Sequence, residues 1–403
     1  MSTTSPSRTA GPTVRLAVVV AGLVGVGFSL RTLMASLPPL EPALRTDLGL
    51  SGAEIGVLTT VPVLCMGLFA PVAARVGHRF GAGRVVAAAV ALVVVGNLLR
   101  GLGDLTWPLF LGTLVAGVGI ALAGTLMPGL VKGFFPPHRT GLATGLTMFA
   151  MMGGAGVASA VTVPVADALG SWPLSLGLWG VVAALGLVAW LPVARIAHRR
   201  HVATDRPQTA SGRLPWRSAT ALLVAAFMAC QSVQFYSSLA WLAPTYVDEH
   251  WTPAGSGLLL ALFTGAQLVS GLVGPWLTDK VRDERVLLLA ACASGLAGEL
   301  GIWLAPTAAP WVWALLLGIG QGAAFALGLV LLVRYAVDAA ASARFTAMCF
   351  LLCYTTAAVG PTALGAVRDA TGTDRWIWAV LVAVMVPQVA SALALRPDRT
   401  KVS

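Results

Sequence analysis

Long apolar stretches, separated by short clusters of charged, proline and glycine residues, run along the whole chain. Most are about 20 residues long, the length of helix that crosses the ~30 Å hydrocarbon core of a bilayer. The pattern predicts an all-α polytopic membrane protein with twelve transmembrane helices. The expected spans are 14–36, 53–74, 83–100, 108–131, 141–165, 174–194, 217–243, 255–277, 286–304, 311–333, 345–366 and 376–395.

Composition and charge support a membrane location. Hydrophobic residues make up 57% of the 403 residues, and charged residues only 10%. The formal net charge of +10 could indicate a nucleic-acid partner, but most Lys and Arg residues fall in alternate loops, on one side of the expected spans. The positive-inside rule then places both termini in the cytoplasm. We therefore expect a multi-pass protein of a bacterial-type inner (plasma) membrane, embedded in the lipid bilayer, with no nucleic-acid partner.

A repeated loop indicates two related halves. The basic, glycine-rich segment 75–84 follows the second expected span, and segment 274–285 occupies the equivalent place in the second half of the chain. Internal repeats of this kind are typical of secondary transporters. The predicted division is a cytoplasmic tail at 1–13, a six-helix bundle at 14–194, a cytoplasmic linker at 195–216, a second six-helix bundle at 217–395 and a cytoplasmic tail at 396–403.

Arg31 is the one basic residue that this division places inside a span. An arginine there costs about 2.5–3.5 kcal/mol on insertion scales, so such residues usually face a bundle interior or a water-filled cavity. Two interpretations follow. Either Arg31 binds a small anionic or polar solute, or it snorkels to the outer surface and pairs with an acidic residue such as Glu41 or Glu54.

Polar side chains are densest in the seventh expected span. Gln231, Gln234 and Ser238 share one helical face. Buried amides need hydrogen-bond partners, which can be other helices or a substrate, and both alternatives stay open. The single amide of Gln321, in the tenth span, favours a structural role. Glu299, in the ninth span, is a candidate for proton coupling or for a structural hydrogen bond.

Sequence signals of enzymes and ATP-driven pumps are missing. The chain has no phosphate-binding glycine–lysine loop and no zinc-binding His/Glu helix, and all five histidines fall in expected loops. No serine or cysteine is paired with an intramembrane histidine. The sequence therefore favours secondary transport over catalysis, with no metal site and no cofactor.

Several motifs together resemble one family. They are Leu30-Arg31, Pro38-Pro39, Asp47-Leu-Gly-Leu-Ser51, Leu58-Thr-Thr-Val-Pro-Val-Leu-Cys-Met-Gly67, Gly117-Val-Gly-Ile120, Met127-Pro128, Lys132 and Ala240-Trp-Leu-Ala-Pro244. Over nearly the whole chain this set resembles the cyanate-transporter branch of the major facilitator superfamily, which also includes proteins described as 2-nitroimidazole transporters. The resemblance implies two pseudo-symmetric six-helix bundles around a central cavity that opens alternately to each side.

The resemblance also implies roles for particular residues. The first, fourth, seventh and tenth spans would line the cavity, and the substrate-binding candidates are Arg31, Gln231, Gln234, Tyr236, Trp241 and Gln321. The cytoplasmic loop signature of the superfamily is only partly kept, because His78-Arg79 replaces the acidic and basic pair in the first half. The gating or coupling candidates are Lys132, Asp279, Lys280, Glu299 and Glu54.

These features predict a secondary active transporter that moves a small anionic or polar solute, such as a cyanate-like ion or a small carboxylate, by alternating access. Arg31 would supply the positive charge, because charge-assisted hydrogen bonds to a guanidinium are strong. A proton is a candidate co-transported ion, and we expect a monomer. The alternatives are efflux of neutral or aromatic compounds such as nitroimidazoles or drugs, and a non-transporting membrane sensor.

Overall fold

The computed structural model describes residues 12–103, 105–135, 137–201, 214–278, 280–281, 283–396 and 399–402, without the side chains of 12–15, 71, 74, 132, 137–142, 144, 198–201, 339–340 and 343. This part of the chain is almost entirely helical. Its helices are α1 (Pro12–Ala35), η1 (Pro38–Leu40), α2 (Glu41–Leu48), α3 (Gly52–Phe80), α4 (Ala82–Arg100), α5 (Thr106–Phe134), α6 (Pro137–Leu169), α7 (Trp172–His201), α8 (Ala219–Asp248), α9 (Pro253–Thr278), α10 (Glu284–Leu304), α11 (Pro310–Arg334), α12 (Ala339–Thr371) and α13 (Arg375–Ala394).

Twelve spans of the described residues are long and apolar enough to cross a membrane, which confirms the predicted fold class. Two details differ from the expectation. Helix α7 continues to His201, past the expected end of the first bundle. The acidic segment after Pro39 was expected to be a loop but forms the short helix α2, which ends where Gly49 adopts a left-handed conformation with φ of 64°.

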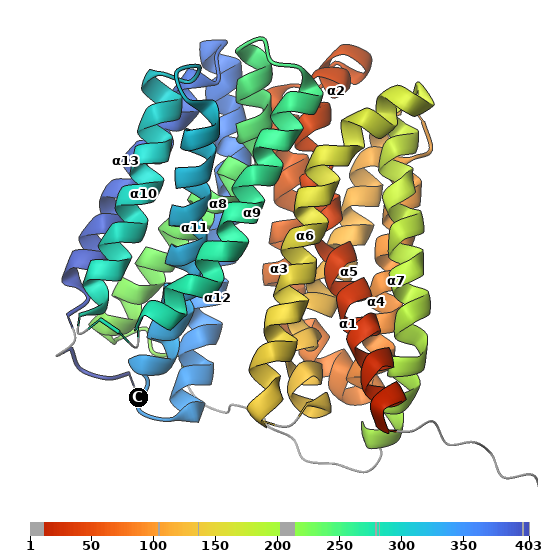
Figure 1. Ribbon diagram of the computed structural model, residues 1–403, viewed down its shortest axis with the longest axis vertical. Helices are drawn as coiled ribbons and strands as arrows, with labels where there is room; N and C mark the ends of the chain where they lie inside the picture. Colours follow the sequence, from red (N-terminus) through yellow and green to blue (C-terminus); the bar gives the residue numbers. More distant parts are fainter. Residues whose placement is uncertain are drawn as a thin grey trace, which may run out of the picture.

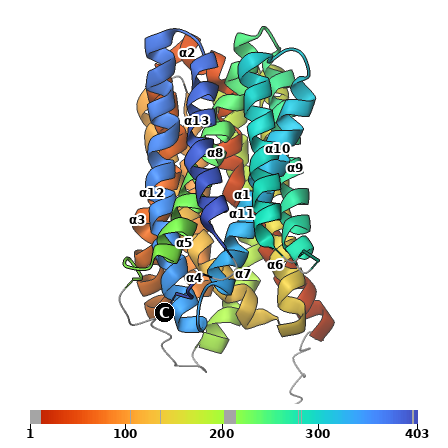
Figure 2. The same ribbon diagram turned by 90° about the vertical axis from the view of Figure 1, so that its left-hand side faces the viewer.

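The helices form two side-by-side halves, α1–α7 and α8–α13 (Figure 1). Helix α1 begins at the same end of the molecule as the C-terminus, which we call the terminal end; α2 lies at the opposite end, which we call the α2 end. In the view turned by 90°, α12 lies beside α3 of the other half (Figure 2). These two helices form one of the main contacts between the halves.

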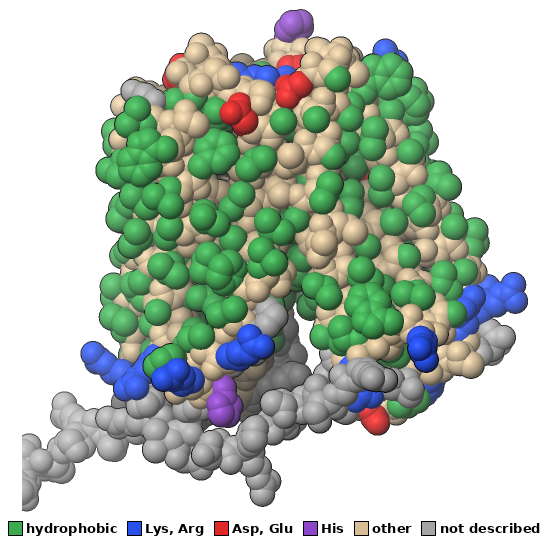
Figure 3. All heavy atoms as spheres, turned by 180° about the vertical axis from the view of Figure 1, so that it is seen from behind, with side chains coloured by type: hydrophobic (Ala, Val, Ile, Leu, Met, Phe, Trp, Pro, Cys, Tyr) green, Lys and Arg blue, Asp and Glu red, His purple; other side chains and the backbone are tan. Residues whose placement is uncertain are grey.

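The halves touch closely toward the α2 end. A Cβ atom added to Gly56 of α3 would lie 2.6 Å from the carbonyl oxygen of Pro361 in α12, and one added to Gly257 of α9 would lie 2.3 Å from that of Ser159 in α6. Nearer the terminal end, a Cβ on Gly145 or Gly153 of α6 would meet no described atom within 4 Å. The surface between the halves is notched at the terminal end (Figure 3). The halves therefore meet at the α2 end and separate toward the terminal end.

A buried arginine supports the end of α1. Arg100, the last residue of α4, is only 1% exposed. Its Nη1 donates hydrogen bonds to the carbonyl of Leu33 and to Oδ1 of Asn97, both at 3.3 Å. The last carbonyls of a helix carry partial negative charge. The guanidinium thus stabilises the turn of α1 that bears Arg31.

Candidate functional site

Arg31 lies at the centre of the molecule, where the two halves face each other. It is partly buried one turn before the end of α1, but the chain continues through η1 and α2 before it leaves the α2 end. Its Cζ lies 5.6 Å from the ring centre of Phe235 and 5.9 Å from that of Tyr236, both on α8. The hydroxyl of Tyr236 in turn contacts Sδ of Met66, the middle residue of α3, at 4.0 Å. Arg31 is therefore at mid-height of the bundle.

No described acidic residue neutralises Arg31. Its Nη1 is buried and has no hydrogen-bond partner in the described part of the chain. Glu41 pairs with Arg45 and Arg368 instead, and Glu54 accepts hydrogen bonds from the backbone and hydroxyl of Ser51 at the start of α3. The interpretation in which Arg31 pairs with Glu41 or Glu54 at the outer surface is therefore not what the structure contains.

Two aromatic rings of α8 lie beside the guanidinium of Arg31. Phe235 and Tyr236 pack edge to face, with ring centres 4.8 Å apart. Tyr354 of α12 packs against the same apolar cluster as Phe235 and Tyr236. A cation over aromatic faces is attracted by their quadrupoles, without losing its hydrogen-bond donors. Sequence reasoning did not single out Phe235, whose only signal was its place next to Tyr236.

The three glutamines predicted to bind substrate form a separate cluster. Gln321 of α11 donates from Nε2 to Oε1 of Gln234 at 2.7 Å, and Nε2 of Gln231 donates to the carbonyl and Oε1 of Gln321 at 3.2 and 3.3 Å. All three side chains are buried, at most 2% exposed. They already satisfy one another between α8 and α11, so a contact with substrate stays a prediction for them.

Trp241 lies further toward the α2 end. It is fully buried, and its Nε1 donates to the carbonyl of Pro361 in α12 at 3.1 Å. Its ring centre is 5.8 Å from Cζ of Arg368. The indole thus helps to build the contact region near the α2 end, away from Arg31.

The gating and coupling candidates are scattered. Lys280 is exposed, with its Nζ 3.5 Å from the ring centre of Trp276. Glu299 is 0% exposed, and neither of its carboxylate oxygens has a hydrogen-bond partner among the described residues. Glu54 caps α3. The side chain of Lys132 and all of Asp279 lie outside the described residues.

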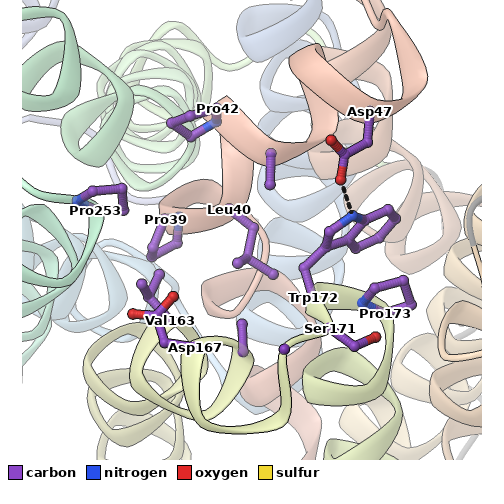
Figure 4. Close-up of a pocket in the computed structure, with 13 residues that line it drawn as sticks. Pro39, Leu40, Pro42, Asp47, Val163, Asp167, Ser171, Trp172, Pro173 and Pro253 are labelled. Atoms are coloured by element: carbon purple, nitrogen blue, oxygen red, sulfur yellow. Dashed lines mark hydrogen bonds between the residues drawn. The ribbon is translucent and has the colours of Figure 1, made fainter.

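A cavity of about 600 Å³ opens at the α2 end, apart from Arg31 (Figure 4). Its wall contains Asp47, which accepts a hydrogen bond from Nε1 of Trp172 at 2.8 Å, and Asp167. No Lys or Arg lines it. Its carboxylates would repel an anion, so this cavity does not serve the chemistry suggested by Arg31. Within the described residues, no group of three His, Cys, Asp or Glu side chains is arranged to hold a metal ion.

The described residues form twelve apolar helices in two halves, with a central arginine that has no acidic partner among these residues, and this is the architecture of a polytopic membrane transport protein. The model of the Major Facilitator Superfamily matches residues 19–361, and the chain belongs to this family. It is 33% identical to the 2-nitroimidazole transporter of Escherichia coli (strain K12), over 88% of this chain and 89% of that protein. It is 30% identical to the cyanate transport protein CynX of the same organism, over 94% of this chain and 97% of that protein.

Solved structures confirm the fold. The inward-open structure of the xylose transporter XylE from E. coli matches 95% of each chain, with a TM-score of 0.70 at 16% identity. The resemblance to the cyanate and 2-nitroimidazole transporter branch is likewise confirmed by the two relatives. The chain is a multi-pass membrane transporter with a small-molecule substrate, and not an enzyme.

Proposed function

We propose that this transporter moves a small, flat solute that is anionic or strongly polar, and that Arg31 binds it. The observation that carries the proposal is the buried Nη1 of Arg31, which has no acceptor among the described residues. A buried charged donor is costly unless it is paired and hydrogen-bonded. A bound anion would supply the missing acceptor through a charge-assisted hydrogen bond.

The position of Arg31 supports alternating access. The guanidinium comes from the first half, whereas the rings of Phe235 and Tyr236 come from the second. A solute between them would touch both halves, and rocking of one half against the other about a central site is the usual transport cycle of such folds. Each chain contains this whole site, so a monomer would be sufficient.

The orientation follows from charge. Lys and Arg side chains gather at the terminal end (Figure 3). By the positive-inside rule this end faces the cytoplasm. We infer that both termini are cytoplasmic, and that the halves are here separated toward the cytoplasm and in contact toward the outside.

The names of two relatives indicate two candidate solutes that one site can accommodate. They are named for cyanate, a small linear anion, and for 2-nitroimidazole, a flat and polar aromatic ring. The guanidinium of Arg31 fits the anion, while the rings of Phe235, Tyr236 and Tyr354 favour a flat aromatic solute as the second candidate.

The test combines Arg31→Ala and Arg31→Lys with a screen of cyanate, nitrate, small carboxylates and 2-nitroimidazole. Ligand binding raises thermal stability by mass action. We expect Arg31→Ala to weaken anion binding by about 1.5–3 kcal/mol, roughly tenfold to 150-fold, and Arg31→Lys to restore part of it. The matched control is Arg75→Lys, at an exposed position of α3.

Counterflow in proteoliposomes then measures transport by the same variants. Binding and transport that stay at wild-type levels in both Arg31 variants would refute the role of Arg31. Binding of 2-nitroimidazole but of no anion by the wild-type protein, retained in Arg31→Ala, would favour the second candidate. Failure of the wild-type protein to exchange any solute would favour the sensor alternative.

A further inference from the structure

A second group of charged side chains joins the halves near the α2 end. Arg368 of α12 contacts three carboxylates: Glu41 of α2, Asp248 at the end of α8 with an Nη2–Oδ1 distance of 2.8 Å, and Asp374 just after α12. Arg45 of α2 also contacts Glu41. We call these five residues the seam cluster, because Glu41 and Arg45 belong to the first half and the other three to the second.

The seam cluster has more acid than base. Three ionised carboxylates facing two guanidinium groups leave one net negative charge. Arg45 and Asp248, at the rim of the cluster, are 30% and 39% exposed, whereas the other three side chains are buried. The side chains of Glu41 and Arg368 are only 3% and 10% exposed. Like charges that share a buried site cannot all ionise easily, and one of them tends to keep a proton.

Asp374 is the carboxylate best placed to keep that proton. Its side chain is 2% exposed. It touches Nε of Arg368 as an ion pair, yet neither of its oxygens accepts a hydrogen bond with good geometry from a described residue. Burial, together with the nearby charges of Asp248 and Glu41, raises the pKa of Asp374 to about 8 even though Arg368 and Arg45 oppose the shift.

A cavity at the α2 end lies beside Asp374, whose own carboxylate oxygens are buried. Its volume is about 130 Å³, and its wall includes Asp248, Glu249, Asp374 and Arg375. A proton can therefore enter or leave through this cavity without crossing the bundle. Asp369, one residue after Arg368, does not take part in the seam cluster, because its two oxygens accept hydrogen bonds from the backbone of Gly52 and Ala53 at the start of α3.

We propose that the seam cluster is a proton-binding site that closes the α2 end, with the proton carried by the carboxyl group of Asp374. When the halves part, Glu41 and Arg45 withdraw and water hydrates the remaining groups. Asp374 then returns toward its ordinary acidity and gives its proton to the water at the α2 end. The inference rests on the alternating-access part of the proposed function and not on the choice of solute.

The direction of the pH effect follows from linkage. The pKa of Asp374 is higher in the closed form than its usual value of 3.8 in water. Protonation of Asp374 therefore favours the closed form. This stabilisation is complete below the pKa that Asp374 has in the open form, and it is lost as the pH rises through about 8. One proton changes the closed-to-open ratio by up to about tenfold per pH unit within that window.

The test measures a distance across the seam, with no solute present. Labels are placed at Thr46→Cys on α2 and Ala370→Cys on α12, both exposed, with Cys230, the one native cysteine that is not fully buried, replaced by Ser. Double electron–electron resonance in nanodiscs from pH 5 to 9 then reports the closed fraction. We expect the fraction to fall as the pH rises. Asp374→Asn should stay closed at every pH, because the amide mimics the protonated acid.

Two further variants separate titration from simple contact. Asp369→Asn should lower the closed fraction at all pH values and keep the pH slope, because it weakens a contact across the seam without removing the proton site. Asp248→Asn should move the transition to lower pH, because one negative neighbour of Asp374 is gone. A flat wild-type profile, or an Asp374→Asn profile that keeps the wild-type slope, would overturn the proposal. Loss of solute binding in Arg31→Ala leaves this readout unaffected, so the two proposals fail separately.

Discussion

The hydrogen bond between Gln321 and Gln234 decides whether the glutamine cluster is a scaffold or a binding surface. The bond is 2.7 Å long, between side chains that are 2% and 0% exposed. Gln321→Leu keeps the volume but leaves Oε1 of Gln234 without its donor. Nε2 of Gln231 still donates to the backbone carbonyl of residue 321 at 3.2 Å, so Oε1 of Gln234 is the one acceptor left without a donor.

A buried acceptor without a hydrogen-bond donor costs about 1–3 kcal/mol in water-soluble proteins. Hydrogen bonds between membrane helices contribute roughly 0.6–2 kcal/mol. We therefore expect Gln321→Leu to lose about 1–2 kcal/mol of stability. Gln234→Leu should lose a similar amount of stability, because it leaves Nε2 of Gln321 without its acceptor. The double variant removes both polar groups, so its loss should be smaller than the sum of the two.

Thermal unfolding in detergent, with and without solute, is the assay. Gln267→Leu is the matched control, since Nε2 of Gln267 is buried and has no hydrogen-bond partner among the described residues. Its replacement should leave stability unchanged or raise it. The scaffold reasoning is refuted if Gln321→Leu unfolds at the wild-type temperature but no longer responds to solute. In that case the amides contact the solute, as the family resemblance implies.

Two other substitutions probe packing. Gly56→Val should push α3 away from α12, because a Cβ added there would lie 2.6 Å from the carbonyl oxygen of Pro361. The label distance across the seam should then lengthen. Gly67→Ala should leave that distance unchanged, because its Cβ would meet Tyr354 at an ordinary 3.5 Å. Glu299→Gln should preserve or raise the unfolding temperature, because neither carboxylate oxygen has a described partner to lose; a clear drop would reveal a hydrogen bond that depends on the charged or protonated acid.

The spans were predictable because the length and composition of an apolar stretch are local properties. The same reliance on local composition missed helix α2, because acidic residues such as Glu41 and Asp47 are typical of a solvated loop. In the structure Glu41 is buried against Arg368, far away in the chain. Only the fold brings that partner close, and no spacing in the sequence reports it.

The candidate site was predictable in part. Arg31 stands out because a charge in an apolar span is costly wherever it lies. Its surroundings do not stand out, because an aromatic residue such as Phe235 is ordinary in any membrane helix. Helical spacing correctly put Gln231 and Gln234 on one face, but it could not reveal that Gln321 of another helix occupies that face.

Toward the α2 end, the contact between α3 and α12 is made of backbone. A Cβ added to Gly365 would lie 2.2 Å from the carbonyl oxygen of Gly52, so at this point the helices meet with no side chain between them. The free energy gained by hiding apolar surface scales with the area removed from water, about 25 cal/mol per Å². Parting two glycine surfaces exposes little such area. The closed and open forms can therefore lie close in free energy. One bound solute or one proton is then enough to shift the equilibrium between them.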